Sequence, residues 1–163
     1  MNRAEIVEFR LKPAMKECAL HRKRLHVAWE EASTFAPLQG TSVDDFTEEQ
    51  VRTLDQLLFR FGKLQDAIGT RLLPAILRSV QEWRDDEPFL DKLNRAEKLG
   101  VLPSVDRWQL LRELRNQTAH EYPDQPETAR ANLRLLVANV PVLEEAHRQM
   151  VVWAETRVLA VRY

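Results

Sequence analysis

The side chains best suited to chemistry lie in one short stretch, Arg112-Glu-Leu-Arg115-Asn116-Gln-Thr-Ala-His120-Glu-Tyr122. A histidine has an ordinary pKa of about 6.5, so it can give or accept a proton at neutral pH. An arginine can bind two phosphate oxygens at once. Cleavage of RNA by its own 2′-hydroxyl needs a base for that proton, an acid for the leaving 5′-oxygen and a cation for the phosphorane. We therefore predict His120 as acid/base, Arg115 as phosphate clamp and Asn116 as a group that orients the imidazole or donates to the phosphate.

One chain supplies one histidine in this stretch, whereas the reaction uses both an acid and a base. A two-fold homodimer that brings both helix ends together would place two histidines and two arginines around one phosphate. The competing interpretation is a solvated helix end. His120 would then complement the helix dipole, Arg115 would pair with a carboxylate, and Tyr122 would belong to the core.

The helix that carries these residues should end at Pro123, because proline lacks an amide proton and disfavours the α conformation in the residue before it. Its predicted core face consists of apolar and small side chains: Leu110, Leu111, Leu114, Thr118 and Tyr122. An i, i+4, i+8 stripe lies on the opposite side: Arg112, Asn116 and His120. Arg115 lies at the edge of the apolar arc, where a charge needs a partner or an anion because burying it alone is costly.

The composition describes a globular protein of one domain, residues 1–163, with 44% hydrophobic and 30% charged residues. The net charge of −1 gives no overall attraction to nucleic acid, so RNA contact must depend on a local patch. The single cysteine excludes an internal disulfide and a cysteine-based zinc site. No apolar run approaches a membrane span, and the N-terminal residues lack the apolar core of a signal peptide. We expect a cytoplasmic protein without membrane contact.

Apolar residues recur at helical spacing in five main segments, and no convincing strand is present. The segments span about residues 14–35, 47–83, 89–99, 105–122 and 127 onward, after a short helix over residues 4–11. Thr47 and Gln50 form a capping box, Gly100 is a C-cap and Ser104 an N-cap. Such lengths with short loops predict an all-α, up-and-down bundle of about five helices.

Three prolines fall within the helical patterns, and each removes a hydrogen bond and crowds the preceding turn. We expect Pro13 to interrupt the first helix, Pro74 to kink the second or start a new one, and Pro141 to kink the last. The expected inward-facing residues outside the 105–122 helix are Ile6, Phe9, Met15, Cys18, Arg22, Leu25, Trp29, Ala32, Val51, Leu54, Leu57, Leu58, Phe61, Leu64, Ile68, Leu72, Ala131, Leu135, Ala138, Val142, Ala146, Met150, Trp153 and Val158.

Other polar groups give weaker signals. Lys63 and Asp66 are candidates for the same cleft as Arg112, but a solvated ion-pair face is the more ordinary interpretation. The basic run over residues 21–26 is typical of a solvated helix face, and its two histidines are not spaced as a metal pair. His147 stands alone and is expected to be structural. We predict no metal site.

The spacing Arg115-Asn116-x-x-x-His120-x-Tyr122 resembles the R-x4-H-x-Y signature of HepT-like toxins, which belong to the HEPN superfamily. The segment Arg60-Phe-Gly-Lys-Leu-Gln-Asp66 is similar to the second long helix of such domains. The resemblance implies a helical bundle, usually dimeric, that cleaves RNA without a metal or other cofactor. It also implies a neighbouring nucleotidyltransferase antitoxin, which adds AMP to the motif tyrosine, here Tyr122.

A second function from a different class is compatible with the same helices. Related domains serve as non-catalytic partners that hold substrate for a nucleotidyltransferase. In that case the arginine–histidine pair need not act in catalysis, and the chain would be a binding subunit.

Overall fold

The computed structural model describes residues 1–39, 45–119 and 126–160. Within these ranges the chain forms five continuous helices and no strand, which confirms the all-α bundle. Two of the five contain a wide π turn within their length, and a third ends in one. The first helix consists of α1 (Arg3–Ile6), a π turn (Val7–Leu11) and α2 (Lys12–Ala32), and the second of α3 (Glu48–Ala67), a π turn (Ile68–Leu72) and α4 (Leu73–Ser79). The third and fourth are α5 (Phe89–Leu99) and α6 (Val105–Ala119). The fifth is α7 (Pro126–Ala154), which ends in a π turn (Glu155–Leu159). A 3-10 turn, Ala36–Leu38, follows α2.

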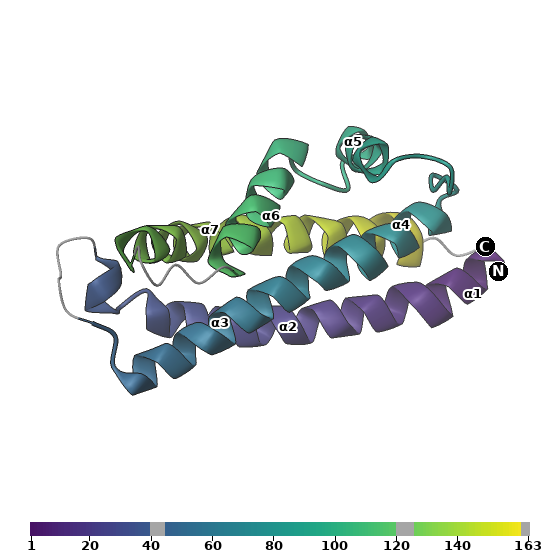
Figure 1. The fold of residues 1–163 in the computed structure, drawn as a ribbon. Helices are drawn as coiled ribbons and strands as arrows, with labels where there is room; N and C mark the ends of the chain where they lie inside the picture. The colour runs from purple at the N-terminus through teal and green to yellow at the C-terminus, as the bar shows by residue number, and fades with distance from the viewer. Residues whose placement is uncertain (40–44, 120–125, 161–163) are drawn as a thin grey trace.

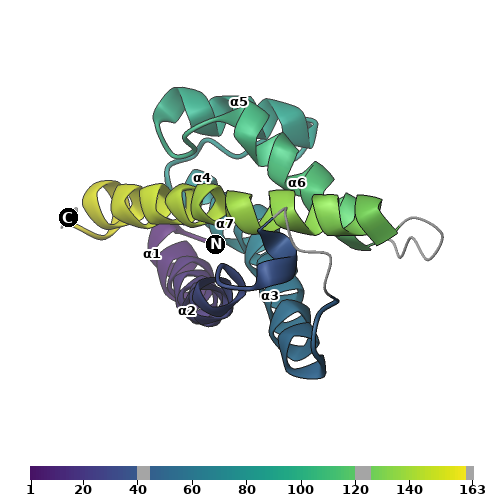
Figure 2. The same cartoon turned by 90° about the vertical axis from the view of Figure 1, so that its left-hand side faces the viewer.

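Three long rods form the body of the bundle: α1–α2, α3–α4 and α7 (Figure 1). The first two run antiparallel along each other, and α7 crosses them obliquely (Figure 2). Helix α6 packs against both α3 and α7, while α5 lies outside this body, above α7 in Figure 2. Two α7 side chains secure the α5–α6 connection: Gln149 donates to the Gly100 carbonyl at 2.8 Å and Trp153 to the Leu99 carbonyl at 3.1 Å.

The predicted helix caps are confirmed. The Thr47 hydroxyl accepts from the Gln50 amide at 3.1 Å, and the Gln50 side chain accepts from the Thr47 amide at 3.0 Å. Gly100 has a φ of 82°, the left-handed conformation that favours glycine after a helix. The Ser104 hydroxyl accepts from the Arg107 amide at 3.2 Å and begins α6. The predicted end of this helix, at Tyr122 and Pro123, lies outside the described residues.

Pro13 does not interrupt the first helix, contrary to the expectation. It comes directly after the π turn Val7–Leu11, in which the amide of Lys12 donates five residues back to Val7. The wider turn moves the preceding carbonyls away from the proline ring, so the chain continues as a helix. Pro74 is the second residue of α4 and follows its own π turn in the same register, so here too the chain continues as one helix instead of starting a new one. Pro141 lies inside α7, which continues to Ala154.

The helix over the first residues therefore belongs to α1–α2, and its buried residue is Leu11 rather than Phe9, which is 66% exposed. The second rod ends as α4 at Ser79, short of the predicted Trp83.

The core is built around the predicted face of α3, where Leu57, Phe61, Leu64 and Ile68 are fully buried. Val51, at the exposed start of α3, is an exception.

The predicted inward faces of α6 and α7 are partly wrong. Leu110 of α6 is exposed, and so are Ala131, Ala138 and Leu135 of α7, the last at 52%. In the first half of α7 the buried stripe is the neighbouring one: Leu136, Val137, Val140 and Leu143. Apolar residues occupy more than one stripe of this helix, so spacing alone does not select the buried one. The contacts of α7 with α2 and α6 select it.

None of the helices in the described ranges combines the length and apolarity that crossing a bilayer would require.

Replacing Phe61 by alanine should lower the free energy of unfolding by about 3–5 kcal/mol, because the side chain is fully buried and its removal leaves a cavity in the core. The matched change, Phe59→Ala, removes the same side chain two residues earlier, where it is 54% exposed. It should cost no more than about 0.5 kcal/mol. Urea unfolding followed by circular dichroism measures both. Equal losses would contradict the orientation of α3.

Candidate functional site

Arg115 of α6 reaches across to Asp66 of α3 and forms a bidentate ion pair. Its Nη2 donates to Asp66 Oδ2 at 2.9 Å, and its Nη1 donates to Oδ1. The predicted need of Arg115 for a partner at the core edge is therefore met by a carboxylate on another helix. Both side chains keep substantial exposure, 39% for Arg115 and 51% for Asp66. The pair is accessible to a ligand.

A glycine makes this contact possible. A Cβ atom added at Gly62, one turn before Asp66 on α3, would lie 3.2 Å from Arg115 Nε. That is tighter than ordinary van der Waals contact, so a larger residue would push the guanidinium away. Gly62 therefore lets the arginine side chain lie flat against α3 on its way to the carboxylate.

The ion pair stands between two clefts, and both clefts include Arg115 and Asp66 in their walls. The larger cleft has a volume of about 490 Å³ and opens between the α3–α4 rod, α5 and α6. The smaller one has a volume of about 270 Å³ and reaches Thr118 and Ala119 at the end of α6. A ligand in either cleft would meet the same guanidinium.

The other predicted site residues divide between these clefts. Arg112 and Asn116 are exposed and line the larger cleft, as expected for the polar side of α6. Lys63 lines the smaller cleft, with its Nζ 5.5 Å from the centroid of the Phe59 ring. The structure thus gathers Lys63, Asp66 and Arg112 around Arg115. His120 and Tyr122 lie outside the described residues.

The ordinary interpretation of Lys63 and Asp66 as part of a solvated ion-pair face fits Asp66, which is 51% exposed and ion-paired. Its partner is Arg115 on another helix, 49 positions away in the sequence. In the described part of the chain, no group of three or more histidine, cysteine, aspartate or glutamate side chains has the arrangement of a metal site.

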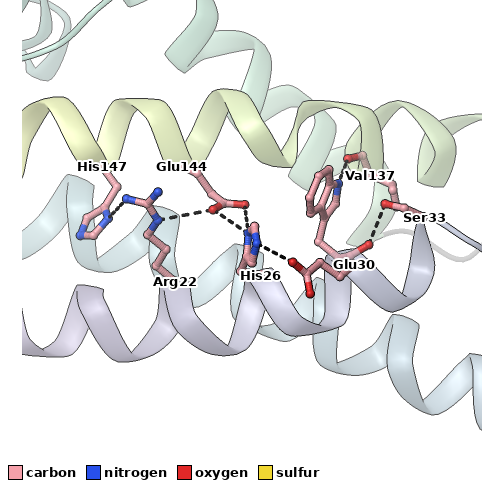
Figure 3. Close-up of polar contacts among 8 residues, drawn as sticks. Arg22, His26, Glu30, Ser33, Val137, Glu144 and His147 are labelled. Atoms are coloured by element: carbon pink, nitrogen blue, oxygen red, sulfur yellow. Dashed lines mark hydrogen bonds and ion pairs between the residues drawn. The ribbon is translucent and has the colours of Figure 1, made fainter.

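A second polar cluster joins α2 to α7 (Figure 3). Glu144 is buried and accepts from His26 Nδ1 at 3.0 Å and from Arg22 Nε at 3.4 Å. Arg22 Nη1 lies 3.4 Å from Nδ1 of His147, which is also buried. The Trp29 indole donates to the Val137 carbonyl at 2.9 Å beside this cluster. These contacts fix how α7 crosses α2.

The interpretation of residues 21–26 as a solvated helix face is therefore wrong for three of these six residues. His21 is buried, and Arg22 and His26 face α7. A signal for this cluster exists in the sequence: Glu144 and His147 share the spacing of the buried α7 residues Val140, Leu143 and Met150. Charged or polar side chains on a buried stripe need partners, and the basic run supplies them.

The environment shifts two imidazoles of this cluster in opposite directions. The hydrogen bond that His26 donates to the Glu144 carboxylate raises the pKa of His26. Burial, together with the positive charge of Arg22, lowers the pKa of His147 to about 4. His147 is thus neutral at physiological pH, and its Nε2 has no hydrogen-bond partner among the residues that the structure describes. The cluster lines neither of the two clefts around Arg115. Its role is to join two helices.

Comparison of the chain with protein-family models, with curated proteins and with solved structures finds no match.

The neutral state of His147 predicts a pH dependence of stability. Its pKa is about 4 in the folded protein and about 6.5 when unfolded. The unfolded chain therefore takes up the proton first, and stability is lost as the pH falls from about 6.5 towards 4. Relative to His147→Gln, the wild type should lose free energy of unfolding on the order of 3 kcal/mol across this window.

His26 supplies the control with the opposite sign. Because its folded pKa is raised, its contribution is fully present below about pH 6.5 and is lost as the pH rises through the folded pKa. His26→Gln should therefore cost more stability at pH 5.5 than at pH 8. Urea unfolding of the three proteins across this range provides the measurement. Parallel pH profiles for all three would contradict both assignments.

Proposed function

We propose that this chain is a toxin-type, metal-independent endoribonuclease of the HEPN class. The observation that carries the proposal is the placement of Arg115. This arginine lies exposed between two clefts, and five positions later comes His120, followed by Tyr122. The proposed toxin is cytoplasmic and works as a homodimer, with RNA as substrate and a nucleotidyltransferase as antitoxin.

In the proposed reaction, His120 of one protomer takes the proton from a ribose 2′-hydroxyl, and the 2′-oxygen attacks the adjacent phosphorus. The bond from phosphorus to the 5′-oxygen breaks, and His120 of the partner subunit protonates that oxygen. The products are a 2′,3′-cyclic phosphate and a 5′-hydroxyl. Arg115 stabilises the charged phosphorane by bidentate contact, and Asn116 donates to the phosphate or orients the imidazole.

Asp66 holds the guanidinium of Arg115 before substrate binds. An exposed ion pair contributes only about 0–1 kcal/mol, so an RNA phosphodiester, whose single negative charge is shared by two non-bridging oxygens, can displace the carboxylate. Lys63 on one side and Arg112 on the other extend the positive surface from Arg115 into the two clefts. This local patch offsets the absence of a net positive charge on the chain.

The same ion pair favours one alternative function. A guanidinium already neutralised by a carboxylate is what a purely structural arginine would show, and the chain would then be a non-catalytic partner subunit of a nucleotidyltransferase. Expression in a bacterial host separates the two proposals. A toxin arrests growth unless it carries His120→Ala, whereas a binding subunit has no such effect.

Purified protein should cleave total RNA in the presence of EDTA. His120→Ala and Arg115→Ala should each lower the rate by about 10²–10⁴, the usual contribution of a general acid/base or an oxyanion donor. Arg115→Lys should also be impaired, because lysine keeps the charge but loses the bidentate geometry.

Arg107→Ala, an exposed change on the same helix, serves as the control and should cleave as the wild type does. Cleavage by the wild type no faster than by His120→Ala would overturn the nuclease proposal. Cleavage abolished by EDTA would overturn its metal independence.

The antitoxin is proposed to act on Tyr122. The phenol oxygen attacks the α-phosphorus of ATP, pyrophosphate leaves and the phenolic proton passes to solvent, so that tyrosine carries AMP. On an ideal helix Tyr122 falls on the same side as Arg115, so the added phosphate would compete with RNA for the guanidinium.

Incubation with ATP and the neighbouring nucleotidyltransferase should therefore add AMP units to the intact mass, map them to Tyr122 and abolish cleavage. Tyr122→Phe should remain unmodified and active. A fully inhibited wild type without added mass would show that the antitoxin acts by binding alone.

A further inference from the structure

The exposed face of α2 carries positive charge that neither the fold nor the proposed reaction uses. Lys16, Lys23 and Arg24 are all exposed on this helix. Residues of α2 line neither of the two clefts beside Arg115. In both views of the molecule, α2 lies on the far side of the bundle from α5 (Figures 1 and 2). A role for this face is therefore separate from the site around Arg115.

The three cations lack a carboxylate within reach along their own helix. The residues three and four positions before and after each of them are all non-acidic, so no i, i+3 or i, i+4 ion pair can form. Among the residues that the structure describes, none forms a hydrogen bond or an ion pair with Lys16, Lys23 or Arg24. The neighbouring Arg22 and His26 differ, because they contact the buried Glu144 (Figure 3).

The acidic side chains of α2 are engaged by other groups. Each makes a polar contact away from the three cations: Glu17 with Arg71, Glu30 with His26 and Glu31 with Thr53. The chain therefore supplies no counter-charge to this face from the helix that carries it. A negatively charged partner would provide it.

Apolar side chains follow the same face at heptad spacing. Pro13, Leu20 and Val27 are seven residues apart and exposed, Leu20 at 46% and Val27 at 51%. Seven residues make almost two full turns, so the three side chains lie nearly in line along the helix. Lys16 and Lys23 come three positions after Pro13 and Leu20, which is the second seam position of a heptad. The face therefore has the spacing of a helix-pairing seam, apolar at one position and cationic at the other.

We propose that this face of α2 docks an acidic, amphipathic helix of another protein. Apolar side chains of the partner pack on Leu20 and Val27, and its carboxylates pair with Lys16, Lys23 and Arg24. The seam from Pro13 to Val27 rises by about 21 Å, at 1.5 Å per residue, so about four turns of the partner can lie along it. The inference does not depend on the proposed nuclease.

Two other anionic surfaces fit this face less well. Single-stranded RNA binds through stacking of its bases on aromatic rings as well as through phosphate contacts, but the tryptophan of α2, Trp29, donates to the Val137 carbonyl of α7 instead. A helix on a membrane surface inserts a wide apolar face into the bilayer, and the wide apolar face of α2 is already buried in the core. A partner helix needs only the narrow seam that α2 exposes.

Fluorescence anisotropy of a labelled peptide tests the proposal with the full chain. The peptide is about 20 residues long and repeats in heptads, with leucine at one seam position, glutamate at the other and beside it, and alanine elsewhere to favour the helix. A matched peptide carries lysine in place of glutamate. We expect the acidic peptide to bind, with an affinity that falls as salt is added, and the basic peptide not to bind.

Two variants of α2 locate the binding. Lys23→Gln/Arg24→Gln removes two of the charges, and Leu20→Ser removes one of the apolar contacts. Each should weaken binding of the acidic peptide by about tenfold, because the first loses two charge pairs and the second an anchor of the seam. All three positions are exposed, so circular dichroism and thermal unfolding should show the fold of the wild type.

Matched substitutions on other helices serve as controls. Lys98→Gln/Arg107→Gln removes the same two charges from exposed positions on α5 and α6. Leu90→Ser removes a leucine that is 50% exposed, close to the exposure of Leu20. Both controls should bind the acidic peptide as the wild type does.

Absence of binding by the acidic peptide overturns the inference, and so does equal weakening by the α2 variants and the controls. Weakening by Lys23→Gln/Arg24→Gln with unaltered binding in Leu20→Ser overturns it too, because that result indicates charge attraction without a helix seam. Single-stranded RNA and vesicles of equal parts phosphatidylcholine and phosphatidylserine are tested in the same way. Binding of either through Lys23 and Arg24, without binding of the peptide, assigns the face to that surface instead.

Discussion

The packing of α3 on two neighbouring sides is the constraint on which the rest of the molecule depends. One side buries Leu57, Phe61 and Leu64 against the other long helices. An adjacent side faces α6, with Gly62 and Gly69 placed two turns apart. Gly62 of α3 leaves room for Arg115, and Gly69 in the π turn after α3 leaves room for Trp108, so both α6 side chains lie against the backbone of the α3–α4 helix. Core packing and the geometry of the candidate site are thus set by the same helix.

This arrangement explains why a polar pair can lie so close to the core. Asp66 of α3 lies between the two glycines in the sequence, and the guanidinium reaches it over Gly62. A substitution that added bulk at Gly62 would displace the arginine while leaving the apolar face of α3 intact. Displacement of the Arg115 side chain would then change the shape of both clefts, because Arg115 and Asp66 line each of them.

The polar cluster between α2 and α7 serves a different purpose. Its buried carboxylate, Glu144, is satisfied by one imidazole and one guanidinium. Replacing such a network by apolar residues is often neutral or stabilising in other proteins, so its presence is a weak argument for stability. A directional network does fix the register of two helices in a way that apolar contact does not. We infer that it specifies the crossing of α7 over α2.

Local signals in the sequence determined much of the secondary structure. The all-α class, the capping box at Thr47, the C-cap at Gly100 and the inward stripe of α3 follow from side chains that act within a few residues of one another. The partner requirement of Arg115 also followed from its place on a helical wheel. The sequence could not name Asp66 as that partner, because the two residues lie 49 positions apart and meet only when α6 packs on α3.

Tertiary packing decided the remaining features for the same reason. The buried stripe of α7 was chosen by contacts with α2 and α6 among stripes of similar apolar content, and Leu135 was left outside. Pro13 and Pro74 each follow a π turn that keeps the helix continuous, whereas Pro141 lies within the α-helical part of α7, and spacing alone does not distinguish these cases. The burial of Lys92 against Trp83 depends on how α5 folds back on the connection before it. Spacing in the sequence fixes which residues share a helix face, and only the packed helices decide which face meets a partner and which meets a ligand.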